Sequence, residues 1–63
     1  MRVKCHGFEG TLLYLEARED LARRADGSAR YVVRSYDIDL RLDTGEKMSI
    51  DGVSSSEIEV TDG

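Results

Sequence analysis

The chain has 63 residues and a formal net charge of −4 at pH 7, with one cysteine, one histidine and no proline. A chain this short holds one domain at most, residues 1–63, and lies near the lower limit for burying a sufficient core. One cysteine excludes a disulfide framework, and one cysteine with one histidine cannot supply the four ligands of a structural zinc site. We therefore expect no cofactor and no metal.

The first six residues alternate charged and apolar side chains, unlike the continuous apolar segment of a signal peptide. No apolar run approaches the roughly 20 residues of a membrane-spanning helix. Because the one thiol is free and no export signal is visible, the sequence predicts a cytoplasmic protein without a membrane segment.

The front of the chain predicts two strands. Val3 and Cys5 alternate with charged residues up to a turn at Gly7, and a second strand is expected over about residues 11–17. Residues 18–26, which follow, allow two interpretations. Acidic and arginine residues four positions apart favour a short helix there, whereas an ordered charged loop fits the same residues equally well.

The clearest strand covers residues 36–42, where apolar and charged side chains alternate as in a strand with one buried and one solvent-exposed face. Residues 31–33 have the opposite phase, so we expect a bulge or sharp bend near residues 33–35. Residues 47–51 and 57–61 repeat the alternation. Asp-Gly and Thr-Gly pairs separate these segments, and such pairs supply the positive φ angles of tight hairpin turns.

The last segment combines a polar single turn at the three serines 54–56 with a short strand that carries Ile58 and Val60. This order is similar to the end of SH3-like barrels, in which a 3₁₀ turn precedes the closing strand. The stretch from Gly10 to Tyr14 likewise resembles the bent early strand of such barrels. The resemblance concerns a superfold, which does not determine function.

We therefore expect an all-β, mainly antiparallel fold. It is a small five-stranded SH3-like β-barrel with a charged excursion between its second and third strands, containing at most one short helix around residues 18–26. The expected core collects the apolar residues of the alternating segments, namely Val3, Cys5, Phe8, Leu13, Leu15, Val32, Tyr36, Ile38, Leu40, Leu42, Met48, Ile50, Val53, Ile58 and Val60.

Candidate catalytic groups receive structural explanations. Cys5 and His6 are neighbours on a strand and point to opposite faces, so they cannot form a dyad; we expect Cys5 in the core and His6 exposed. Asp37 and Asp39 share a face about 7 Å apart, but no pocket-forming loops accompany them, which favours a solvated surface. The serines 54–56 have no neighbouring base. The sequence therefore predicts no enzyme.

Acidic residues dominate the second half of the chain, since residues 31–63 contain three basic and eight acidic residues. If strands 36–42, 47–51 and 57–61 pair as a meander, their carboxylates form one outward surface that attracts a basic partner and repels nucleic acid. Ordinary solubilisation is the alternative explanation. The candidate partner-binding residues are Asp37, Asp39, Asp43, Glu46, Glu57 and Glu59.

A group of arginines offers an opposing candidate site. Arginines on small barrels can contact phosphates, but acidic residues interleave with these, and no Phe or Trp is present among them to stack bases. Pairing within the chain or protein contact explains them as well. The candidate phosphate-binding residues are Arg18, Arg23, Arg24, Arg30 and Arg34.

Three functional hypotheses follow. The first is a non-catalytic protein-interaction module, a stand-alone adaptor or inhibitor that docks its acidic face on a basic partner surface. That surface can belong to a nucleic-acid-handling protein, as it does for phage-encoded anti-defence inhibitors. The second is a small nucleic-acid-binding barrel that uses the arginines of residues 18–34. The third is a structural subunit of a homo-oligomer or homodimer, because an exposed edge strand readily pairs with its copy.

Overall fold

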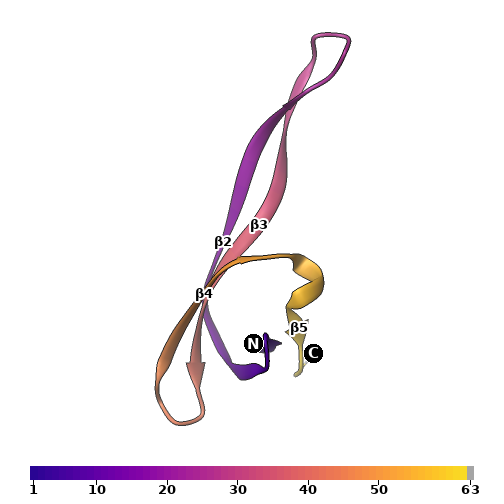
Figure 1. Ribbon diagram of the computed structural model, residues 1–63. Helices are drawn as coiled ribbons and strands as arrows, with labels where there is room; N and C mark the ends of the chain where they lie inside the picture. Colours follow the sequence, from indigo (N-terminus) through magenta and orange to yellow (C-terminus); the bar gives the residue numbers. More distant parts are fainter. Residues whose placement is uncertain (63) are drawn as a thin grey trace.

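The computed structural model describes residues 1–62, which form one antiparallel sheet of five strands in the order β4-β3-β2-β1-β5 (Figure 1). The strands are β1 (Arg2–Cys5), β2 (Phe8–Arg23), β3 (Ala29–Leu42), β4 (Lys47–Val53) and β5 (Glu59–Val60), with a 3₁₀ turn, η1 (Ser55–Glu57), before β5. The predicted all-β, antiparallel class is confirmed. Strands β4 and β5 are the two edges of this sheet, so the described residues do not close into a barrel.

Tight turns with positive φ angles connect the first four strands. His6 and Gly7, at φ 51° and 83°, form the two-residue turn between β1 and β2. The β2–β3 and β3–β4 turns end on Gly27 and Gly45, at φ 88° and 89°, and each glycine N–H donates to the carbonyl three residues earlier. These are the three-residue hairpin loops in which a left-handed glycine follows a type I turn, as the glycine pattern predicts.

Strands β2 and β3 are the longest elements, and their pairing runs from Gly10–Leu42 to Arg23–Ala29. Beyond the reach of β1 and β4 they continue as a two-stranded hairpin that projects from the remainder of the sheet (Figure 1). We call residues 15–36 the arm and the remainder the body; at the base of the arm Tyr36 still pairs with Val53 of β4, and the two-stranded part begins at the Arg18–Ser35 pair. The radius of gyration is 14.7 Å, against about 10.6 Å for a compact chain of this length. The arm accounts for this excess.

Both alternatives for residues 18–26, the short helix and the ordered charged loop, are wrong for residues 18–23, which are part of a strand. Strand β2 continues without interruption to Arg23, and each of its residues from Arg18 onward pairs with a residue of β3. The backbone groups of this stretch therefore bond to a neighbouring strand, which overrides a local helical preference of a few tenths of a kcal/mol per residue. The arginine-rich segment of residues 18–26 therefore belongs to the outer half of the β2–β3 hairpin.

A bulge in β3 confirms the irregularity expected near residues 33–35. Arg18 pairs with Ser35 and Glu19 with Val33, so Arg34 is the extra residue. The bulge restores the phase between the two halves of β3 and increases the local twist. A second bulge, at Leu13 of β2, lies where that strand leaves the body.

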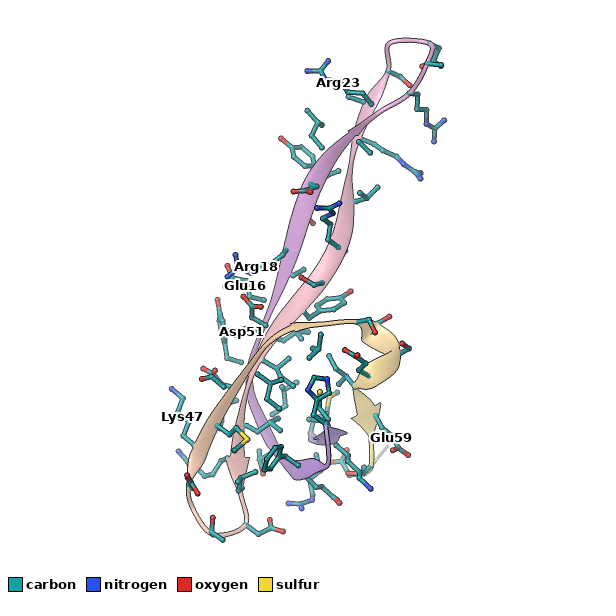
Figure 2. The ribbon with its side chains drawn as sticks, viewed as in Figure 1. Glu16, Arg18, Arg23, Lys47, Asp51 and Glu59 are labelled. Carbon is teal, nitrogen blue, oxygen red and sulfur yellow. The ribbon has the colours of Figure 1, made fainter. Side chains whose placement is uncertain are left out.

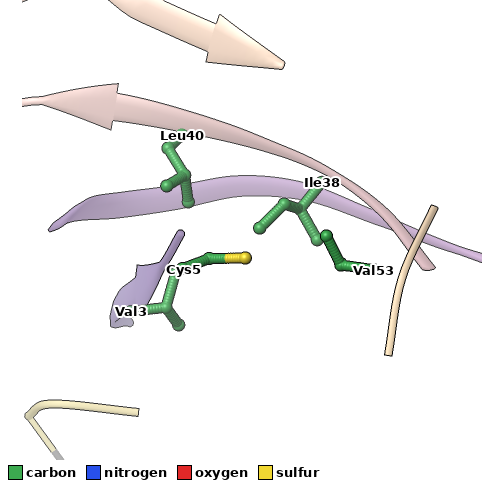
Figure 3. Close-up of a cluster of buried hydrophobic side chains, with 5 residues drawn as sticks. All are labelled: Val3, Cys5, Ile38, Leu40 and Val53. Atoms are coloured by element: carbon green, nitrogen blue, oxygen red, sulfur yellow. The ribbon is translucent and has the colours of Figure 1, made fainter. Parts of the chain in front are cut away.

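The core lies in the body, between the sheet and the segment that crosses to β5. Its five buried side chains, drawn in Figure 3, are Val3, Cys5, Ile38, Leu40 and Val53. Half-buried residues pack against them, namely Leu12, Tyr36, Leu42, Ile50 and Ile58. Alternation along β3 produced this arrangement, because Ile38 and Leu40 point inward while Asp37 and Asp39 point outward.

Four residues of the predicted core are instead exposed: Phe8, Leu13, Leu15 and Val60. Leu13 is the extra residue of a bulge, and Leu15 lies where the arm has left the body. Val60 belongs to a two-residue edge strand. Val32 and Met48 are half-buried outside the main cluster.

Two further expectations are corrected by the strand pairing. Strand β4 does not end at Asp51 but continues to Val53 through a bulge with Gly52 at φ 71°. Strand β5 pairs with β1 rather than with β4, through Val3–Val60 and Lys4–Glu59. The meander assumed for the acidic surface is therefore not formed.

Candidate functional site: the hairpin arm

The two faces of the arm differ in chemistry. Residues that oppose each other across an antiparallel pair share a face, and residues two apart on one strand do too. The pairs Leu21–Tyr31 and Ala17–Tyr36 therefore lie on the same face as the inward-pointing Ile38. We call this side the apolar face of the arm; its apolar residues are Leu15, Ala17, Leu21, Tyr31, Val33 and Tyr36, and the charged Glu19 and Arg23 of β2 lie on the same side.

The apolar face is exposed to a degree that is unusual for its residue types. Tyr31 is 72% exposed, Leu15 and Leu21 are each 48% exposed, and Val33 is 46% exposed. Isolated exposed apolar residues are ordinary, but a contiguous row of them marks an interaction surface. A two-stranded hairpin has no second layer to cover such a row.

An apolar pocket of about 210 Å³ continues this face into the body. Leu15 and Tyr36 belong to both the pocket and the arm, and the remaining lining residues come from the body: Met1, Val3, Leu12, Ser55, Ile58 and Val60. Its volume is below the roughly 300–1,000 Å³ of typical small-molecule sites. The pocket can take one apolar side chain of a docked protein segment.

The opposite face of the arm is charged and internally paired where the arm meets the body. Arg18 Nε donates to Asp37 Oδ2 at 2.5 Å, and the Gly52 N–H donates to Asp37 Oδ1 at 3.0 Å. These two donors, the Gly52 N–H foremost, hold the pKa of Asp37 below its usual value. The hydrogen bond that Arg18 donates to Asp37 raises the pKa of Arg18 in turn. Figure 2 shows Arg18, Glu16 and Asp51 together at this junction.

Three more of the acidic candidates also bond within the chain. Asp39 accepts from Ser49 Oγ at 2.7 Å, and Asp43 makes an ion pair with Arg2 at 3.0 Å. Glu57 accepts from the Ser54 N–H and lies 3.5 Å from His6 Nε2; the bond from Ser54 is the main cause of its lowered pKa. Of the six acidic candidates, only Glu46 and Glu59 make no ion pair within residues 1–62.

The acidic candidates do not form one surface. Asp37 and Asp39 lie on β3, whereas Glu59 lies on β5 at the far edge of the sheet beyond β2 and β1. Figure 2 shows Lys47 of the neighbouring strand β4 and Glu59 on opposite sides of the body. The structure therefore brings together only part of the predicted acidic set.

The arginine candidates separate into paired and unpaired groups. Arg18 pairs with Asp37, and Arg34 NH1 lies 2.9 Å from Asp20 Oδ2. Near the outer end of the arm, three arginines make no ion pair with any described residue: Arg23, Arg24 and Arg30. Figure 2 shows Arg23 at this end.

One carboxylate shapes the outer turn itself. Asp26 accepts hydrogen bonds from the Ser28 hydroxyl at 2.7 Å and from the Ser28 N–H at 2.9 Å. These bonds, the hydroxyl one first, lower the pKa of Asp26 and keep its charge on the turn. The outer end therefore carries three cationic side chains around one anionic side chain.

The thiol and the imidazole lie where the sequence places them. Cys5 is buried in the core, and burial raises the pKa of its thiol, which makes the thiolate less accessible. His6 is exposed in the β1–β2 turn.

No cluster of three or more His, Cys, Asp or Glu side chains that could hold a metal ion occurs within residues 1–62. Over the same residues, no helix has the length and apolar character needed to cross a membrane.

Sequence reasoning missed the apolar face as a site, although it contained a signal for it. The tight Asp-Gly turn at Gly27 sets the register of the hairpin around it. Counting back from that turn places Leu21 opposite Tyr31, and Ala17 and Leu15 follow on the same side. The assumption of a helix concealed this pairing.

Comparisons of the chain with protein families, with curated proteins and with solved structures found no match.

Proposed function

We propose that this chain is a non-catalytic protein-interaction module, an adaptor or inhibitor, that binds its partner through the apolar face of the arm. One observation carries the proposal: Leu15, Leu21, Tyr31 and Val33 are exposed in a row on a projecting hairpin. Apolar and aromatic side chains supply most of the binding energy in protein interfaces. A hairpin that projects from a body can insert them into a concave partner.

The acidic residues have a supporting role in this proposal. Carboxylates bonded within the chain stay negatively charged and contribute to the field around the molecule, even though they offer few free acceptors. Such a field speeds encounter with a basic partner surface more than it stabilises the complex. We therefore propose that the net charge steers a basic partner and that the arm supplies the affinity.

The body resembles small barrels in its order of elements. A 3₁₀ turn precedes the last strand, and that strand pairs with the first. Both features favour an SH3-like body that is open between β4 and β5. This assignment concerns architecture, and the functional proposal depends on the arm alone.

Photo-crosslinking in the native cell tests the proposal with a matched control. Leu21 and Ala22 are neighbours on β2 whose side chains point to opposite faces. A photoreactive residue in place of Leu21 should form adducts with a protein, whereas the same residue in place of Ala22 should form few. Equal adduct yields from both positions, or none from Leu21, would contradict the proposed surface.

The unpaired arginines favour a second candidate function, in which the outer end of the arm binds nucleic acid. A two-stranded β-ribbon fits the major groove, and the exposed aromatic ring of Tyr31 lies on the same face of the arm as Arg23. Three phosphate contacts predict that the logarithm of the binding constant falls with the logarithm of salt concentration with a slope of about −2.7. A mobility shift with duplex DNA and RNA over a salt series measures this slope. No shift at low salt removes this candidate.

A further inference from the structure

We infer that the apolar face of the arm binds the same face of a second copy of this chain, with the two arms antiparallel about a two-fold axis through the Leu21–Tyr31 pair. This inference rests on the proposed function, because it names the occupant of the same surface. Each copy has a net charge of −4, so the attraction between copies comes from the local Glu19–Arg23 contacts and the apolar side chains and not from the acidic field. Its basis is that the pattern of charge and size on this face is complementary to itself.

The charge pattern is the first part of the argument. Pairing is regular from Glu19–Val33 to Arg23–Ala29, so Glu19, Leu21 and Arg23 point to the same side of the arm. Leu21 lies midway between the acid and the base. A two-fold axis through Leu21 that reverses the strand direction therefore places Glu19 of each copy against Arg23 of the other.

The sizes of the facing side chains are the second part. On β3, Tyr31 lies midway between Val33 and Ala29, which share its face. The two-fold axis places Leu21 of one copy opposite Leu21 of the other. It also places the larger Val33 of each copy opposite the smaller Ala29 of the other. Alternation of large and small residues lets two sheet faces interdigitate at the usual separation of about 10 Å.

The available ionic partners are the third part. Arg23 makes no ion pair with any residue in 1–62, and Glu19 makes none either. Of the other charges near them, Asp20 pairs with Arg34 and Arg18 with Asp37, and the unpaired Arg24 and Arg30 lie at positions that alternate to the opposite face of the arm. The two charges that the arrangement requires are therefore free to pair between copies.

The dimensions of the arm allow this arrangement and limit its strength. The overlap runs from Ala17 to Ala25 of each copy, about 26 Å of strand, and a two-stranded ribbon is about 10 Å wide. Each outer turn then ends near Tyr36 of the other copy, so the two bodies lie at opposite ends of the dimer. Interfaces this small are at the weak end of specific association, and we expect a Kd of about 10 μM or weaker.

Edge pairing between copies is the main alternative form of dimer. Strands β4 and β5 have free edges, and the outer part of the arm has free edges on both sides. Such a dimer would extend the sheet but leave the apolar face in water. Packing face to face covers the exposed Leu21, Tyr31 and Val33, which is why we favour it.

Charge exchange tests the arrangement without depending on any other partner. Sedimentation equilibrium of the wild-type chain over a concentration series should show a monomer–dimer equilibrium. Glu19→Arg and Arg23→Glu should each weaken dimerisation by about tenfold or more, because each creates two like-charge contacts per dimer. The doubly substituted chain should regain the dimer, and an equimolar mixture of the two single variants should form heterodimers. Glu46→Arg, which makes the same charge change on the β3–β4 turn, should behave as wild type.

Two results would overturn the inference. One is a wild-type chain that stays monomeric at about 1 mM, a concentration far above the expected Kd, and the other is a dimer that both single substitutions leave unchanged. Crosslinking from Leu21 separates this failure from failure of the proposed function. If the chain is monomeric and Leu21 forms adducts with another protein, the proposed binding surface stands and only the dimer inference is overturned. If Leu21 forms no protein adduct at all, the dimer inference and the proposed function are both overturned.

Discussion

Arg18 of β2 lies beside Asp37 of β3, with Nε 2.5 Å from Oδ2, at the point where the arm leaves the body. The same carboxylate accepts from the Gly52 N–H in the β4 bulge, so one side chain joins three neighbouring strands. The side chain of Asp37 is only 13% exposed, in contrast to the 66% of Arg18. The junction therefore ties β2 and β4 to β3 at the base of the arm.

We predict that Asp37 contributes stability that depends on pH. Its folded pKa is lowered, chiefly by the Gly52 N–H, so its contribution is complete above the unfolded pKa of about 3.9 and is lost as the pH falls through the folded value. Urea unfolding of wild type and Asp37→Asn should therefore differ near pH 7 and converge in acid. Parallel stabilities over the whole range would contradict the role given to this carboxylate.

We predict that Gly10→Ala destabilises the body. Gly10 is buried where β2 pairs with both β1 and β3, and a Cβ there would collide with the backbone carbonyl of Arg41. Overpacking of this kind costs about 1–3 kcal/mol. Urea denaturation measures the free energy of unfolding, and Thr11→Ala, a substitution at the exposed neighbouring position of the same strand, is the control. A Gly10→Ala chain as stable as the control would refute the close approach.

We predict that the body folds without the outer arm. A variant that joins Arg18 to Ser35 through an Asn-Gly turn keeps the pair that ends the regular ladder and removes residues 19–34. None of the five core residues lies in the removed part, so the free energy of unfolding should change by less than about 1 kcal/mol. Thermal unfolding followed by circular dichroism measures this change. Loss of cooperative unfolding would show that the arm is part of the folding unit.

The alternating segments made much of the fold predictable. Residues 36–42 have a strict period of two, which local sequence alone reveals, and Ile38 and Leu40 are buried as that period requires. The phase change before them correctly predicted the bulge, which the structure places at Arg34. Both features depend on residues that are close in the sequence.

The errors concern long-range pairing. Residues 18–23 form a strand because residues 29–35 lie alongside and pair with them. The charge pattern of residues 18–26 alone is compatible with a helix and with a charged loop, and it contains no information about that partner strand. The partner of β5 is likewise fixed by the packing of Ile58 against the core rather than by its own alternation. The acidic set followed from that pairing, so an error in strand order became an error in the surface.

The central claim is that Leu21 and Tyr31 lie side by side on one exposed face of a hairpin. The hydrogen bond from the Arg24 N–H to the Ser28 carbonyl fixes the alternation of the ladder and makes Leu21–Tyr31 a non-hydrogen-bonded pair, in which the two Cα atoms are about 4.5 Å apart. Nuclear Overhauser spectroscopy measures this directly. We predict a strong contact between the Leu21 and Tyr31 Hα protons. Contacts between residues three apart throughout residues 18–26, without that cross-strand contact, would contradict the account.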